Sequence, residues 1–259
     1  MTKVRTLIKV LQTFGLIEVF LIIYRKMCSD VRPKSNYQSH LTPQCDTEIT
    51  SVFRSVPCEV EEIESARNEL KNYLDANLRN PTIRKSFFDS KFDFGEASNE
   101  ILFLLIRILK PSVVLETGVA AGKSSDTILH ALRLNEKGHL FSVDVTNQVG
   151  ELIQEDNKSR WSLFVLPKFR RSRAFTMFTQ RLGSIDFFLH DSDHSDVWQL
   201  FELSIVMKCV PPPNILFFDD VSHSLISEIQ SVYPSYSVHY ILEKSKCAAL
   251  IVRSARESD

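Results

Sequence analysis

The chain has 259 residues, of which 44% are hydrophobic and 24% are charged, so it suits a folded globular protein and not a disordered or fibrous one. Its formal net charge of -1 gives no electrostatic basis for binding nucleic acid. The five cysteines are odd in number and form no CxxC pair. This pattern favours reduced thiols and a cytoplasmic location over a disulfide framework or a zinc site.

Residues 1–26 form an apolar segment with basic residues at both ends. Lys9, Gln12 and Glu18 interrupt the apolar run, which leaves it shorter than the ~18 to 20 residues of a membrane-spanning helix. No small-residue cleavage site follows, so a secretory signal is not expected. We expect an apolar helix that packs on protein, including a second copy of the chain, or on a membrane surface, and the sequence leaves both open.

The next two segments differ in periodicity. Residues 27–58 have none and predict a linker. Apolar residues at helical spacing then run on until Pro81 stops them, and we expect residues 59–94 to be a helical region that helps to cover the ligand pocket. The ligand-binding domain is expected to occupy residues 95–259 and to begin with a helix from about Glu96 to Leu109, which has a broad apolar face and which Pro111 ends.

Strands and helices alternate through this domain, which is typical of a mostly parallel sheet with helices on both faces. The last stretch predicts two strands joined at Lys244–Lys246, an antiparallel hairpin at the sheet edge. The fold class expected is therefore α/β, a doubly wound and mostly parallel sheet with an antiparallel C-terminal hairpin and additional N-terminal helices. Before the hairpin, the expected strands are Val113–Leu115, His139–Asp144, Ser162–Leu166, a strand from Ile185, and the NILFFDD stretch from Asn214.

A turn of small residues separates the first expected strand from its helix. After Glu116 and Thr117 the chain reads GVAAG, from Gly118 to Gly122, and a helix starts near Lys123. Glycine and alanine let a ligand approach the backbone closely, and the free amides at a helix start donate hydrogen bonds. An open α/β sheet builds a nucleotide pocket in this way at its first strand.

An acidic residue, Asp144, ends the second strand 28 positions after Glu116. A carboxylate at this place can bind both hydroxyls of a ribose, which is the interpretation we favour because a glycine turn precedes it. The alternative is a helix cap or a solvated loop residue.

Three further carboxylates, Asp191, Asp219 and Asp220, stand at the ends of two strands that should be neighbours. Clustered carboxylates repel one another unless a cation lies between them, and oxygen ligands suit Mg²⁺, Mn²⁺ or Ca²⁺. The sequence therefore predicts a metal site. The alternative is that one of them binds a substrate amine and the others cap helices.

Two histidines flank Asp191. His194 lies three residues later, and a neutral imidazole there could remove a proton from a hydroxyl near the metal. A purely structural histidine is the alternative. His190 should point to the opposite side of its strand from Asp191, so we expect it to be a packing residue.

With these residues in hand, the chain resembles the class I S-adenosylmethionine-dependent methyltransferases over about Gly95 to Arg253. The resemblance rests on the segments ETGVAAGKSS, SVDV, FFLHDSDHS and LFFDDV. Within this class the chain resembles the small-molecule O-methyltransferases of the macrocin and mycinamicin type. These enzymes carry an aspartate that is followed, after two other residues, by a histidine, and they carry an acidic pair after the next strand. The resemblance implies a seven-stranded, Rossmann-like methyltransferase fold.

The resemblance also implies roles for individual residues. Asp191, Asp219 and Asp220 would hold Mg²⁺ or Mn²⁺, and His194 would be the catalytic base. The activity implied is methyl transfer from S-adenosylmethionine to a hydroxyl of a small molecule, helped by the metal. The residues that would bind S-adenosylmethionine are Glu116, Gly118, Gly122, Ser124 and Asp144.

Two other functions stay open. A nicotinamide-dependent oxidoreductase would need a third glycine in the turn, where Ala121 and Lys123 stand, and is the weaker alternative. A non-catalytic binding or scaffold protein would keep the fold and recruit a partner or membrane through residues 1–26. Binding of S-adenosylmethionine separates the scaffold from the enzyme.

Overall fold

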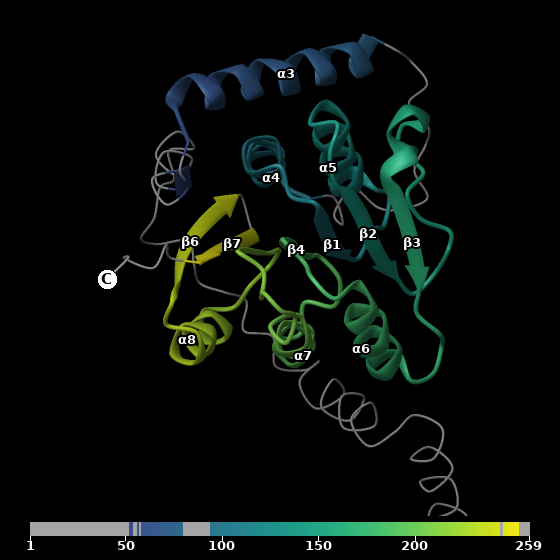
Figure 1. Cartoon of the computed structure of the whole chain (residues 1–259), viewed down its shortest axis with the longest axis vertical. Coiled ribbons are helices and arrows are strands. Elements are labelled where there is room, and N and C mark those ends of the chain that lie inside the picture. The colour runs from purple at the N-terminus through teal and green to yellow at the C-terminus, as the bar shows by residue number, and fades with distance from the viewer. Residues whose placement is uncertain (1–51, 54–55, 57, 80–93, 244–245, 254–259) are drawn as a thin grey trace, which may run out of the picture.

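The structure is a computed structural model (Figure 1), and it describes residues 52–53, 56, 58–79, 94–243 and 246–253. The apolar segment 1–26 and most of the expected linker lie outside these residues, so their predicted contacts with a membrane, a partner or a second copy stay predictions. Among the described helices, none combines the length and the apolar character that crossing a membrane requires.

The described strands form one sheet in the order β3-β2-β1-β4-β5-β7-β6. The first five strands of the chain run parallel, and β7 is antiparallel to both β5 and β6. This topology confirms the predicted fold class, including the antiparallel hairpin at the edge. The strands are β1 (Val113–Thr117), β2 (His139–Asp144), β3 (Trp161–Val165), β4 (Phe187–His190), β5 (Ile215–Phe218), β6 (Tyr236–Glu243) and β7 (Lys246–Arg253).

Helices cover both faces of the sheet (Figure 1). One face carries α4 (Glu96–Leu109) and α5 (Lys123–Leu134), and α3 (Val60–Arg79) crosses outside these two helices. The other face carries α6 (Arg171–Leu182), α7 (Asp196–Val206) and α8 (His223–Val232). A short 3-10 helix, η3 (Glu155–Arg160), precedes β3. Neither α8 nor η3 was predicted from the sequence.

The helix α4 has the bounds that its sequence predicts. Its sequence EASNEILFLLIRIL is apolar after the first turn, and the residues from Ile101 to Ile106 are all buried. Lys110 follows with a left-handed φ of 49°, and its N–H caps the helix by donating to the carbonyl of Ile106. Pro111 cannot continue a helix, so the chain turns directly into β1.

Alternate residues of the central strands enter two separate hydrophobic cores. Leu189 and Phe217 face the core under α4 and α5, whereas Phe188 and Phe218 face the core under the other helices. All four residues of β4 and of β5 are buried. A parallel sheet needs this cover on both faces, because its strands are apolar on both sides.

Part of the N-terminal region is packed into the domain. Val52, Phe53 and Val56 are at most 6% exposed and belong to the core under α4 and α5. These residues end the segment 27–58 that the sequence predicts as a linker. The packed fold therefore begins before residue 59.

Buried polar contacts hold α3 against α5. The hydroxyl of Tyr73 donates to Asp126 Oδ2 at 2.6 Å, and the other carboxylate oxygen of Asp126 accepts from Asn157 Nδ2 and from the backbone N–H of Gln154. The ring of Tyr73 also stacks on His130 with 3.6 Å between ring centroids. The helix is thereby fixed to the domain by side chains from three elements.

We expect His130 to make the protein less stable in mild acid. The ring is 5% exposed, and burial together with the positive charge of Arg133 lowers its pKa to about 4. Between pH ~6.5 and ~4 the unfolded chain therefore binds a proton that the folded chain does not, so stability falls as the pH falls. Urea unfolding measures the free energy of unfolding at pH ~7 and at pH ~4.5. Between these two pH values this free energy should fall by about 2 kcal/mol less in His130→Phe than in the unmodified protein. Parallel losses in the two proteins would contradict this assignment.

Candidate active site

The sequence-predicted site residues lie at the carboxyl edge of the sheet. After β1 the chain forms β2 on one side of β1, and it later places β4 on the other side. Ligands of open α/β sheets bind where the strand order reverses in this way, beyond the carboxyl ends of the strands. The turn after β1 and the loop after β4 meet at this point.

The two glycines of the turn after β1 are required by close contacts. Gly118 has a φ of +84°, and a Cβ placed on it would lie 1.9 Å from the carbonyl oxygen of Asp191. Gly122 has a φ of +93°, and a Cβ there would lie 2.8 Å from Gly150 Cα. The backbone N–H of Gly118 donates to the carbonyl of Val143 in β2 at 2.9 Å. The turn therefore packs between the carboxyl end of β2 and the residue that follows β4.

Glu116 lies below the turn and is fully buried. Its carboxylate accepts hydrogen bonds from the hydroxyls of Ser124, Ser125 and Ser142 at 2.6 to 2.8 Å. Burial raises the pKa of Glu116, while the three hydroxyls act in the opposite direction. These contacts tie the start of α5 to β1 and β2. The predicted contacts of Glu116 and Ser124 with a cofactor stay predictions.

Asp144 lies beside the turn and is partly exposed. Its Oδ2 accepts from the backbone N–H of Val119 at 2.9 Å, and its Oδ1 accepts from the N–H groups of Val145 and Thr146. Each carboxylate oxygen has two lone pairs, so these bonds leave capacity for a hydroxyl ligand. Ribose binding by Asp144 stays a prediction that this position permits.

Asp191, His194 and Asp219 form a compact group, which we name the acid–imidazole group. One ligand atom from each lies within 4.8 Å of the other two. The Nδ1–H of His194 donates to the backbone carbonyl of Asp219 at 3.2 Å, and Nε2 lies 4.0 Å from Asp191 Oδ1. Because Nδ1 carries the proton in this arrangement, the lone pair of Nε2 faces the carboxylates.

The surroundings of His194 favour the neutral form of its imidazole. Burial lowers the pKa of His194, and the nearby His190 adds to this effect, whereas Asp219 and Asp220 act in the opposite direction. The carboxylates of Asp191 and Asp219 are hard oxygen donors of the kind that Mn²⁺ and Mg²⁺ accept. The side chains present therefore fit the predicted metal.

Asp220 follows Asp219 directly but lies outside this group. Its side chain is exposed, and it is not a member of the acid–imidazole group among the described residues. Its backbone has a left-handed φ of 51°, unlike that of Asp219 before it. The structure thus brings Asp191 and Asp219 together with His194, the predicted base, and metal binding by Asp220 stays a prediction.

A buried polar network beneath the acid–imidazole group was not predicted from the sequence. His190 is fully buried, as expected of a packing residue, but its Nδ1 lies 2.6 Å from Glu202 Oε2. Glu202 is 1% exposed and lies in the middle of α7. The only sequence signal was an acidic residue within an otherwise apolar helix, LFELSIV.

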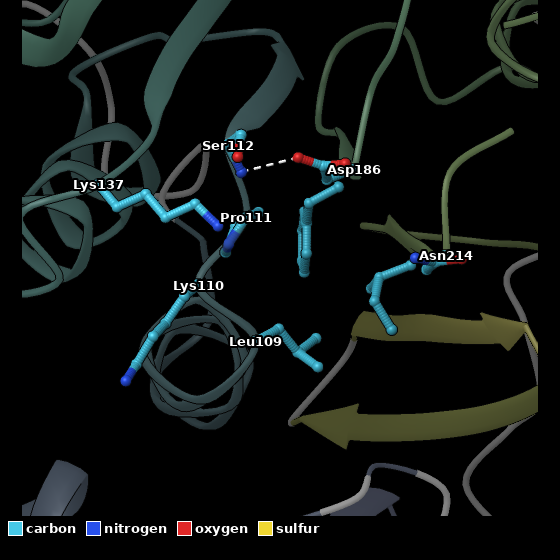
Figure 2. A pocket seen from close by; sticks show the side chains of 9 residues that line it. Leu109, Lys110, Pro111, Ser112, Lys137, Asp186 and Asn214 are labelled. Carbon is cyan, nitrogen blue, oxygen red and sulfur yellow. Dashed lines mark hydrogen bonds between the residues drawn. The ribbon is translucent and has the colours of Figure 1, made fainter. Parts of the chain in front are cut away.

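A cavity of about 220 Å³ lies at the opposite edge of the sheet, where β1, β4 and β5 begin (Figure 2). The carboxylate of Asp186 lines it and accepts from the backbone N–H groups of Ser112 and Val113 at 2.7 and 3.0 Å. These bonds satisfy the donors at the start of β1. The cavity belongs to the amino edge of the sheet and is not part of the candidate site.

One protein family matches part of the chain. Residues 115–221 match the family described as "Methyltransferase domain". This segment contains the glycine turn, Asp144 and the acid–imidazole group. Among curated proteins, none matches the chain.

Several solved structures of methyltransferases are similar to this chain. An S-adenosylhomocysteine-bound methyltransferase from Podospora anserina is 11% identical, with a TM-score of 0.50, and the match covers 84% of this chain and all of that one. An S-adenosylhomocysteine complex of an O-methyltransferase from Bacillus cereus is 15% identical, with a TM-score of 0.47, covering 81% of this chain and all of that one. An S-adenosylmethionine complex of an O-methyltransferase from Streptomyces achromogenes is 13% identical, with a TM-score of 0.47, covering 83% of this chain and all of that one.

The family match and the sheet order together confirm the predicted resemblance. Residues 115–221 match a methyltransferase domain, and the described sheet has the Rossmann-like fold of a solved methyltransferase.

Proposed function

We propose that the protein transfers a methyl group from S-adenosylmethionine to a hydroxyl oxygen of a small molecule, with help from a divalent cation. One observation carries this proposal: the backbone of Asp191 lies directly against Gly118. The glycine turn and the acid–imidazole group therefore belong to one site. The similarity in fold to an S-adenosylhomocysteine-bound methyltransferase supports the same donor.

The methyl donor would occupy the turn and the end of β2. Because Gly118 has no side chain, the backbone of Asp191 can lie directly against the turn. Asp144 offers carboxylate oxygens next to the turn for the ribose. In the reaction the bond between sulfur and the methyl carbon breaks while the bond between that carbon and the acceptor oxygen forms. S-adenosylhomocysteine is released. The transfer is an in-line displacement, so much of the catalysis consists of aligning donor and acceptor.

The acid–imidazole group would handle the acceptor. Asp191 and Asp219 would hold the cation, which when bound lowers the pKa of a hydroxyl that it coordinates. His194 Nε2 would accept the proton of the acceptor hydroxyl, because Nδ1 already donates to the carbonyl of Asp219. That bond also fixes the orientation of the ring. Asp219 thus contributes to the site through both its carboxylate and its backbone.

The activity is testable with the full chain. Purified protein with a methyl-labelled donor, Mn²⁺ or Mg²⁺ and a panel of sugars and catechols should label at least one acceptor on oxygen, and a chelator should reduce the rate. If the protein binds neither S-adenosylmethionine nor S-adenosylhomocysteine in calorimetry, the enzyme proposal fails and a scaffold role is favoured.

Replacing His194 by alanine should separate two uses of its Nε2 lone pair. As a base, His194 contributes about 10²- to 10⁴-fold to the rate, so kcat should fall by that factor while the affinity for Mn²⁺ stays within about threefold. Mn²⁺ affinity can be measured by electron paramagnetic resonance without any acceptor present. A loss of Mn²⁺ binding in His194→Ala would show that the imidazole is a metal ligand and would contradict the role of base.

A further inference from the structure

Glu202 is the centre of a buried hydrogen-bond network that joins three elements under the acid–imidazole group. Its Oε2 accepts from the hydroxyl of Thr117 at 2.7 Å and from His190 Nδ1 at 2.6 Å. Its Oε1 accepts from the indole N–H of Trp198 at 2.7 Å and from the hydroxyl of Ser192 at 3.4 Å. A carboxylate has about four lone-pair sites, so this one is fully used.

The partners of Glu202 are the residues whose backbone holds two members of the acid–imidazole group. The carbonyl of Thr117 accepts from the N–H of Asp191 at 2.8 Å, and the carbonyl of His190 accepts from the N–H of Asp219 at 2.9 Å. Thr117 and His190 thus fix the two aspartates through their backbone carbonyls. The side chains of both residues are in turn bound by one oxygen of Glu202, Oε2. Ser192, which directly follows Asp191, is bound by the other oxygen.

Gln199, one turn earlier on α7, contacts the same region from the side of β5. It is fully buried, and its Nε2 lies 3.4 Å from the backbone carbonyls of Asp219 and Asp220. The buried side of α7 thus contacts the ends of β1, β4 and β5 at once. Neither Glu202 nor Gln199 belongs to the acid–imidazole group.

We propose that Glu202 is a positioning residue, which sets the separation of Asp191 and Asp219 for metal binding by joining Thr117, His190, Ser192 and Trp198. This inference rests on the proposed function, because it gives a purpose to the acid–imidazole group. Hydrogen-bond partners of metal ligands typically change metal affinity by about 10- to 100-fold when they are mutated. Glu202 acts one step further away, through the backbone that carries the ligands.

The test is a Mn²⁺ titration of the 259-residue chain and three variants, in which electron paramagnetic resonance measures the free Mn²⁺. Glu202→Gln keeps the shape of the side chain but turns one acceptor oxygen into a donor, and it should weaken Mn²⁺ binding by about tenfold or more. Trp198→Phe removes one of the four donors and keeps an aromatic ring, so it should weaken Mn²⁺ binding by a smaller factor. Trp198→Phe also provides a second test of the positioning role if Glu202→Gln fails to fold.

Leu203→Ala is the matched control. Leu203 follows Glu202 on α7 and is 1% exposed in the apolar core. Truncating this side chain leaves a cavity in the core, which should lower the melting temperature. The affinity for Mn²⁺ should stay within about threefold of that of the unmodified protein. Unchanged Mn²⁺ affinity in Glu202→Gln, or an equal loss in Leu203→Ala, would overturn the positioning role.

A second measurement on the same samples separates this inference from the proposed function. If the unmodified protein binds S-adenosylmethionine in calorimetry but no Mn²⁺, the positioning role and the metal are both overturned while the methyl donor site stands. If it binds Mn²⁺ with the expected order of affinities but no S-adenosylmethionine, Glu202 keeps its role and the proposed methyl transfer fails.

Discussion

Replacing Gly118 by alanine is expected to weaken the binding of S-adenosylmethionine by about 100-fold or more and to destabilise the fold by several kcal/mol. The added Cβ would lie 1.9 Å from the carbonyl oxygen of Asp191, and both atoms belong to the backbone framework, so no side-chain rotation can relieve the contact. Either the turn or the end of β4 must move by more than 1 Å. Calorimetric titration with S-adenosylmethionine and urea unfolding measure the two effects.

Gly183 provides a control that also has a positive φ. It has a φ of +74°, close to the +84° of Gly118, but no atom lies within 4 Å of a Cβ placed on it. Gly183→Ala should therefore cost about 1 to 3 kcal/mol, the strain of an alanine in this rare backbone conformation, and leave cofactor binding unchanged. Equal effects of the two substitutions would show that the contact between Gly118 and Asp191 is not what requires the glycine.

Replacing Asp219 by asparagine is expected to reduce kcat/KM by about 1,000-fold and to abolish measurable Mn²⁺ binding. The side chain is 1% exposed and contributes one of the two carboxylates of the acid–imidazole group. An amide of the same shape keeps the packing but removes the negative charge that a cation requires. Initial rates with saturating donor and Mn²⁺ titrations on the same sample measure both losses.

Asp220→Asn is the matched control for this prediction. The two aspartates are neighbours in the chain, but Asp220 is exposed and lies outside the acid–imidazole group. Its substitution should change kcat/KM by no more than about threefold, because removing an exposed charge usually has a small effect. A loss as large as that of Asp219→Asn would restore the metal site that the sequence predicts, with Asp220 as a ligand.

Most of the fold could be predicted because the strands of this sheet are short apolar runs that end in polar residues. The second expected strand was His139–Asp144, as found, and α4 has the bounds that apolar periodicity and Pro111 predict. The hairpin of β6 and β7 also followed from a local pattern. Carboxyl ends of parallel strands share one edge, so the proximity of the turn, Asp144 and Asp191 followed from the alternation alone.

The rest of the site depends on contacts between residues far apart in the sequence. Glu202 binds Thr117, which lies 85 residues earlier, and no periodicity encodes that pair. The exposed position of Asp220 goes with a left-handed backbone that its sequence, FFDDV, does not specify. Val52, Phe53 and Val56 stand in a segment without periodicity, and only the packed structure places them in the core.

A crystal structure of the full chain with S-adenosylhomocysteine and Mn²⁺ tests the central claim most directly. The anomalous signal of manganese should lie between the carboxylates of Asp191 and Asp219, with the sulfur of the bound cofactor product beside Gly118 and its ribose on Asp144. Manganese bound elsewhere, or a cofactor product away from the turn, would show that these loops do not form one catalytic site.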